Sequence, residues 1–158
     1  MNLEQQLQIL IDQAPEDGVT PQVIANAVNP VLKAFAQQLQ HPQYFTYQSL
    51  DGNWLLTNLS NRQNTNVEKK VIYAFSSLET AKQFQGMNAD PQLIAPQIPV
   101  THILFQLFAL QELDSIVFFE TPDNPNAGVE VHRQDLQGAI QTQLLRYRQS
   151  QSATSRLA

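Results

Sequence analysis

The chain has 158 residues, a net charge of −5 and no cysteine. This length fits one domain with a sizeable core, and 42% hydrophobic against 15% charged residues is typical of a folded protein. The acidic balance disfavours nucleic acid and anionic membranes as partners, and the lack of cysteine excludes disulfides, thiolate nucleophiles and cysteine-bound metals.

The N-terminal segment does not resemble an export signal. Glu4 and several glutamines occupy the region in which a signal peptide carries basic residues and a long apolar run. No apolar run approaches the roughly 18 residues that a membrane span requires. We therefore expect a cytoplasmic protein that binds neither membranes nor nucleic acid.

Two helices are predicted at the N-terminal end. Leucines recur at helical spacing over residues 3–13. Thr20 is expected to cap a second helix with Pro21 at its first position, and an apolar face then continues to Leu39. Pro30 lies inside that face and must kink or split the helix; because the apolar stripe resumes in phase, we favour a kink.

A hairpin follows the helices. Residues 44–48 and 54–59 are rich in aromatic and β-favouring residues and flank Asp51–Gly52. This dipeptide is a strong hairpin signal because glycine tolerates positive φ. Residues 60–68 are Asn-rich and polar and are predicted to form an exposed loop.

A strand-to-helix corner is predicted next. The apolar run Val71–Phe75 stops at two serines and turns at once into a helix. Ser76 is expected at the N-cap, with Glu79 three residues later at capping-box spacing. Gly86 is placed where a glycine commonly ends a helix.

The second half continues the alternation of strands and helices. Residues 93–95 are predicted as a short edge strand. Thr101 is expected to cap helix 102–110, which is apolar nearly all round and therefore buried on more than one side.

Two further strands and a last helix complete the pattern. The strands are expected at 115–119 and 129–132, and the helix at about 134–148. Gly138 lies inside this helix, and we attribute it to a close helix–sheet crossing. The polar tail 149–158 is expected to be frayed.

These elements predict an α+β fold, with a mixed or antiparallel sheet of about five strands packed on three helices. Residues 1–148 are expected to form a single domain. In this domain, residues 1–40 are a helical extension and 44–148 are the sheet-and-helix core. The extension is expected to cover one side of the core or to join a second subunit.

Sequence motifs for common chemistries are missing. No Gly-rich phosphate loop, HExxH or GxSxG occurs. The three histidines are far apart in the chain and are interpreted as ordinary polar residues at element boundaries. We therefore expect no cofactor and no metal.

An acidic group is the best remaining candidate for catalysis. It comprises Glu120, Asp123, Glu130 and His132, with Asp135 nearby. Glu120 ends one predicted strand and Glu130 lies on the next, so the two can face each other across a hairpin. Paired carboxylates can divide acid and base roles or hold Mg²⁺ or Ca²⁺. Solvated hairpin charges are the interpretation that we favour.

An aromatic group on the predicted strands is open to two interpretations. Tyr44, Tyr47 and Trp54, together with Val31 and Phe35 of the second helix, can pack in the core or form a protein-binding surface. Core packing is the better account of the strand aromatics, and the exposed surface is retained as the alternative.

Three stretches between Asp51 and Ile140 share the order and pattern of a known family. They are VIYAFSSLETAKQF, IPVTHILFQL and SIVFFETPDNPNAGVEVHRQDL. The matching positions are Ser76, Glu79, Ala81, Phe84, Pro99, Val100, Ile103, Leu104, Gly128, Val129, Glu130 and Val131. In these stretches the chain resembles the N-terminal domain of the SseB-like family. The resemblance implies an accessory or regulatory cytoplasmic protein that is not an enzyme and acts through contacts.

Three hypotheses for function follow. The leading one is a non-catalytic protein-interaction module whose partner is another protein, including a second copy of the chain. The second is a small acid/base or metal-assisted enzyme that uses the acidic group. The third is a small-ligand sensor with a pocket between helix 101–111 and the sheet.

Overall fold

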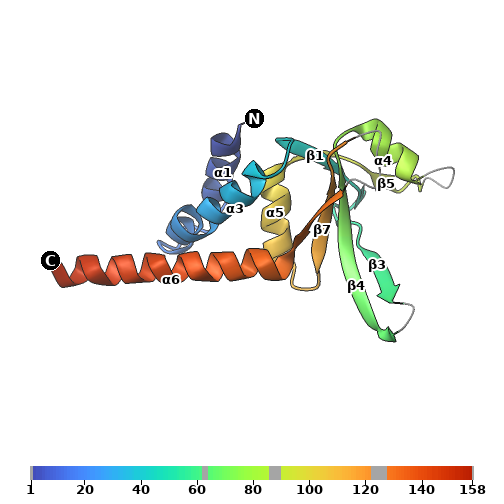
Figure 1. The fold of residues 1–158 in the computed structure, drawn as a ribbon. Helices are drawn as coiled ribbons and strands as arrows, with labels where there is room; N and C mark the ends of the chain where they lie inside the picture. Colours follow the sequence, from blue (N-terminus) through green and yellow to red (C-terminus); the bar gives the residue numbers. More distant parts are fainter. Residues whose placement is uncertain (1, 62–63, 86–89, 122–127, 158) are drawn as a thin grey trace.

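The computed structural model of the protein describes residues 2–61, 64–85, 90–121 and 128–157 (Figure 1). The helices are α1 (Leu3–Asp12), α2 (Thr20–Val23), the π-helical turn η1 (Ile24–Val28), α3 (Asn29–Gln37), α4 (Leu78–Gln85), α5 (Val100–Ala109) and α6 (Arg133–Leu157). The strands are β1 (Gln43–Thr46), β2 (Gln48–Ser49), β3 (Thr57–Asn61), β4 (Asn64–Phe75), β5 (Leu93–Ile94), β6 (Gln97–Pro99), β7 (Ser115–Phe119) and β8 (Gly128–His132).

The predicted α+β fold is confirmed, and its sheet is mixed. In the described part of the chain the main sheet has six strands in the order β6-β1-β4-β7-β8, with β3 also paired to β4. β4 and β7 run parallel, from Val71 opposite Ser115 to Phe75 opposite Phe119. The other pairs are antiparallel. β2 and β5 form a separate two-stranded sheet.

The two faces of the main sheet are covered unequally. Alternate residues of β4 and β7, such as Ile72 and Phe118, enter one large core cluster with residues of α1, α3, α5 and α6. The residues between them, such as Phe75 and Phe119, form a smaller cluster with Ala81 of α4. Figure 1 shows α1, α3 and α5 on one side of the sheet and the short α4 on the other. We call the α4 side the outer face.

The N-terminal helices belong to the large core cluster. Leu7 and Leu10 of α1 and Leu32 of α3 are buried together with Leu104 and Leu107 of α5. Residues 1–40 therefore share one hydrophobic core with the sheet, and their helices cover its inner face.

Gln6 forms a buried polar junction between α1 and α5. Its side chain is 1% exposed. The amide nitrogen donates to the Pro42 carbonyl at 2.8 Å, and the amide oxygen accepts from the Thr101 N–H at 3.1 Å and hydroxyl at 2.8 Å. His102 Nε2 contacts the Gln6 carbonyl at 2.9 Å. Gln6 therefore caps the first turn of α5 from a distant helix, and the expected N-cap role of Thr101 is wrong.

The helix around Pro30 is not split. α2, η1 and α3 follow one another without a break, and the Asn29 N–H bonds the Ile24 carbonyl, five residues back. Pro30 has no N–H for the Asn26 carbonyl, and Gln143 Nε2 of α6 donates to that oxygen at 3.3 Å. A π turn and a side chain from α6 therefore accommodate the proline.

Two other predicted helix caps are displaced. Ser77, not Ser76, caps α4, because its hydroxyl accepts from the Thr80 N–H at 3.1 Å. The Ser76 hydroxyl is buried and has no partner in the described residues. Asp17 replaces Thr20 at the start of α2. It accepts from the Thr20 hydroxyl at 2.6 Å and from the Thr20 and Val19 N–H groups, which lowers the pKa of Asp17 to about 2.

Several predicted boundaries are corrected. The loop expected over 60–68 is wrong where the structure describes it, because β3 and the extended β4 pair there; residues 62–63 lie outside the described part. The hairpin around Gly52 is shorter than expected: the Ser49 N–H bonds the Asn53 carbonyl at 2.8 Å, but β3 then pairs with β4. The helix expected to end near 148 continues as α6 to Leu157, across the predicted tail. The proposed cap at Gly86 lies outside the described residues.

The close crossing expected at Gly138 is wrong. A Cβ built there meets nothing within 4 Å, so the residue faces open space. At Gly128, by contrast, a Cβ lies 2.7 Å from Val117 Cγ1, because β8 packs directly beside β7.

Replacing Gln6 by leucine should destabilise the protein by about 2–4 kcal/mol, because it leaves a buried backbone N–H and a hydroxyl without an acceptor. Urea unfolding measures this. Gln8→Leu, on the exposed side of the same helix, is the control. Equal losses for both variants would contradict the role assigned to Gln6.

Gly138→Ala should stabilise the protein by about 0.5–1 kcal/mol, since alanine reduces the conformational entropy of the unfolded chain and meets no clash. Gly128→Ala should have the opposite sign. Thermal unfolding followed by circular dichroism compares the two. Destabilisation by Gly138→Ala would show that something packs on this residue.

Candidate functional site

The predicted acidic group is not assembled. In the register of β7 and β8, Glu130 lies opposite Val117, while Phe119, which precedes Glu120, lies opposite Gly128. The two carboxylates therefore do not face each other across the strands. Asp123 lies outside the described residues. Among the residues that the structure describes, no group of three or more His, Asp or Glu side chains can hold a metal ion.

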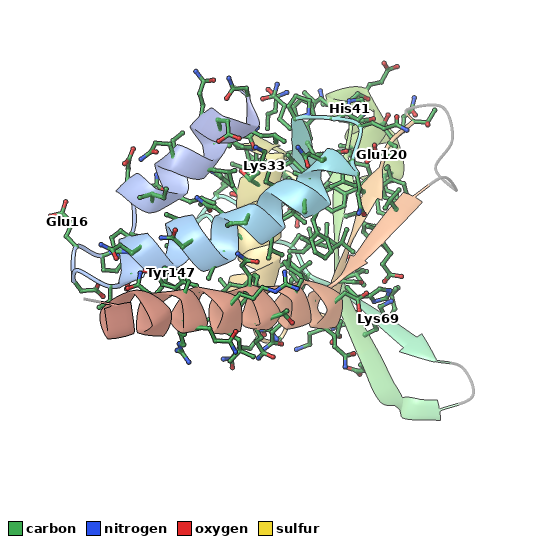
Figure 2. All side chains as sticks on the ribbon, turned by 60° about the vertical axis from the view of Figure 1, so that its left-hand side comes forward. Glu16, Lys33, His41, Lys69, Glu120 and Tyr147 are labelled. Carbon is green, nitrogen blue, oxygen red and sulfur yellow. The ribbon has the colours of Figure 1, made fainter. Side chains whose placement is uncertain are left out.

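Glu120 instead belongs to a buried clamp at the end of β7. Its side chain accepts hydrogen bonds from the Tyr44 hydroxyl and, at 2.7 Å, from the Gln40 N–H. His41 Nε2 contacts the Glu120 backbone carbonyl at 2.9 Å, and Figure 2 shows His41 and Glu120 side by side. Each carboxylate oxygen has a partner, so the clamp joins the start of β1 to the end of β7.

The tyrosine in this clamp is held in its protonated form. Burial, followed by the hydrogen bond to Glu120 and the charge of Glu120, raises the pKa of Tyr44 far above its usual value. A protonated hydroxyl can donate to the carboxylate throughout the physiological pH range. The arrangement is a structural hydrogen bond and leaves no free base at this position.

Glu130 lies in a polar group at the other end of β7. It is paired with Lys69 and accepts from the Ser115 hydroxyl at 2.6 Å, and His132 Nε2 is 3.6 Å from Glu130 Oε1. Desolvation raises the pKa of Glu130, but the hydrogen bonds from Lys69 and Ser115 and the charges of Lys69 and His132 outweigh it and lower the net value. This partly exposed ion pair fits the favoured interpretation of solvated charges, but that interpretation is wrong for Glu120, which is buried.

The proposed aromatic surface is wrong for three of its five residues. Tyr44 is fully buried, and Tyr47 and Val31 are also buried. Trp54 and Phe35 are partly buried against the large core cluster. Tyr44 serves the clamp described above, and Tyr47 packs on Phe75 in the outer-face cluster.

An apolar surface that the sequence did not reveal lies on the outer face. We call it the α4 face and define it by Tyr73, Leu78, Phe84 and Val117. Phe84 is 51% exposed although its ring contacts those of Tyr73, Phe75 and Phe119, with centroids 4.9–6.1 Å apart. Leu78 is also exposed, and Tyr73 and Val117 are half-buried.

The α4 face is exposed because its cover is short. α4 has eight residues and places Ala81 against the sheet, so it shields only one end of the face. Lys69, Glu130 and His132 lie on the same side of the sheet as Val117, by strand alternation and register. An apolar centre with a charged rim is the usual composition of a protein-binding surface.

The spacing of Leu78, Ala81 and Phe84 was visible in the sequence as one stripe of α4. It did not show which of these residues the sheet would leave uncovered.

Comparison with known proteins assigns no relative. No family model matches the chain, and a search of curated proteins found no match. Within the described residues, no helix combines the length and apolar character that crossing a bilayer requires.

Glu130→Gln should reduce stability by about 0.5–1 kcal/mol at neutral pH, as expected for a partly exposed ion pair. The pKa of Glu130 is lowered on folding, so its contribution is present above the ordinary value of 4.5 and is lost as the pH falls through the folded-state pKa. The difference between the parent protein and the variant should therefore shrink between about pH 6 and pH 3.

Urea unfolding at several pH values measures this difference. Glu112→Gln, which removes a more exposed pair with Lys70 at 3.8 Å, is the control and should change stability less. A difference that stays constant with pH would refute the assignment.

Proposed function

We propose that this chain is a non-catalytic protein-interaction module and that its partner docks on the α4 face. The observation that carries the proposal is the exposure of Phe84. Its ring packs on an aromatic cluster of the sheet, yet about half of the side chain is open to solvent. Fully burying a phenylalanine side chain contributes about 1.5–3 kcal/mol, so covering the exposed half of Phe84 favours association.

A second feature of the outer face supports a docked partner. Residues 64–70 of β4 pair with β3 and with no other described strand, and Figure 1 shows this hairpin projecting beyond the rest of the sheet. Isolated two-stranded hairpins are marginally stable in water. Leu59 of β3 is exposed and lies opposite Lys69, on the outer side of the sheet. A partner on the α4 face can therefore also contact the hairpin.

The separation of the acidic group favours this proposal over the enzyme hypothesis. That hypothesis rested on Glu120 and Glu130 acting together. Glu130 lies opposite the middle of β7, Glu120 follows its last residue, and the two have different partners. The resemblance to the SseB-like family agrees with an accessory role and remains a prediction, as does the expected cytoplasmic location. The partner is another protein, and a second copy of the chain is one such partner.

A photo-cross-linking amino acid at position 84 tests the proposal in living cells. Cross-linking from the α4 face should give one discrete adduct, which excess unlabelled protein suppresses. The same amino acid at position 145 is the matched control, because Leu145 is similarly exposed, on α6. Phe84→Ser should weaken association with the adduct's partner about tenfold or more, with Leu145→Ser unchanged. Equal adducts at both positions, or none at position 84, would refute the α4 face as a docking site.

A further inference from the structure

A second surface feature lies on the opposite side of the sheet, among the N-terminal helices and α5. It is a cavity of about 480 Å³, within the size range of small-molecule sites. We call it the Trp54 pocket. Its lining residues come from α1 and the turn after it, from α2 and η1, from β6 and α5, and from the segment before β3: Leu10, Gln13, Ala14, Pro15, Thr20, Ile24, Trp54, Ile98, His102, Phe105 and Gln106.

The lining combines flat apolar walls with a few polar groups. Trp54, Ile98 and Phe105 are each half-buried and contribute apolar surface. Gln13, His102 and Gln106 add hydrogen-bonding groups, and none of the lining side chains is an Asp, Glu, Lys or Arg. A charged ligand would lose its hydration here without gaining an ionic partner, so the lining favours a neutral one.

His102 is oriented by the same junction that joins α1 to α5. Its Nε2 lies 2.9 Å from the Gln6 carbonyl, an acceptor, so Nε2 carries the proton in the neutral ring. Nδ1 is then an acceptor, and it has no hydrogen-bond partner within the described residues. His102 and Gln106, about one turn apart on α5, both line the pocket, and the Gln106 amide can both donate and accept.

The pocket wall includes the start of the π-helical turn. η1 begins at Ile24, one of the lining residues. π turns within α-helices are rare and occur frequently at functional sites. The same turn accommodates Pro30, so it enters the argument only as part of the pocket wall.

We propose that the Trp54 pocket binds a neutral, planar heteroaromatic small molecule. Aromatic side chains hold such rings by stacking, which every flat π-system accepts. A hydrogen-bond donor on the ring pairs with His102 Nδ1, and an adjacent polar edge pairs with the Gln106 amide. A pocket of this kind makes the chain a ligand-responsive protein, independently of its proposed docking surface on the α4 face.

Tryptophan fluorescence provides a direct test, since Trp54 is the chain's only tryptophan. The purified protein is titrated with two neutral probes, lumichrome and adenine, and with adenosine monophosphate as the charged comparison. Isothermal titration calorimetry gives the stoichiometry. We expect saturable one-to-one binding of at least one neutral probe with quenching of Trp54 emission, and weaker binding of the charged nucleotide than of adenine.

Matched variants locate the site. Phe105→Leu should weaken binding about tenfold by removing a stacking surface. Phe35→Leu, on α3 and outside the pocket lining, is the control. Gln106→Leu should also weaken binding and removes no core side chain, so it decides the result if Phe105→Leu fails to fold. Phe84→Ser should leave binding unchanged, which separates this proposal from the α4 face.

Three results would overturn the proposal. They are no saturable binding of either neutral probe, binding that Gln106→Leu leaves unchanged, and tighter binding of the charged nucleotide than of adenine.

Discussion

The buried amide of Gln6 is the interaction on which the arrangement of the molecule depends. The Gln6 side chain hydrogen-bonds the first turn of α5 and the Pro42 carbonyl before β1. The Gln6 backbone carbonyl contacts the ring of His102. A buried polar group is stable only where its donors and acceptors are hydrogen-bonded, and any arrangement that leaves one unpaired costs free energy. The junction therefore sets where α1 lies on α5, and the position of α1 shapes the Trp54 pocket.

The second constraint is the unequal covering of the two sheet faces. The inner face meets α1, α3, α5 and α6 and is closed by a large apolar cluster. Among the residues that the structure describes, α4 and the edge of the small sheet are what the outer face meets, and Phe84 is half exposed. The two proposed sites lie on the two sides of this sheet. The α4 face lies where the outer face lacks cover, and the Trp54 pocket is a cavity among the elements on the inner side.

The charged residues show how strand register decides what a sheet can do chemically. Glu120 and Glu130 are close in sequence, yet Glu130 lies opposite Val117 in the middle of β7, while Glu120 follows the last residue of that strand. One carboxylate is buried and hydrogen-bonded to Tyr44, and the other is paired with Lys69 at the surface. Each carboxylate has its own hydrogen-bond or ionic partners. The two therefore do not share a site in which one carboxylate could raise the pKa of the other.

Elements whose signals are local could be predicted from the sequence. The apolar runs of β7 and of Val71–Phe75 and the apolar character of α5 were predicted, because periodicity and burial preference act over a few residues. Only the tertiary structure decided what depends on distant partners. The Thr101 N–H and hydroxyl donate to a residue 95 positions away, and the Tyr44 hydroxyl donates to a carboxylate 76 positions away. The exposure of Phe84 depends on how far α4 extends over the sheet, and no local pattern encodes contacts of that range.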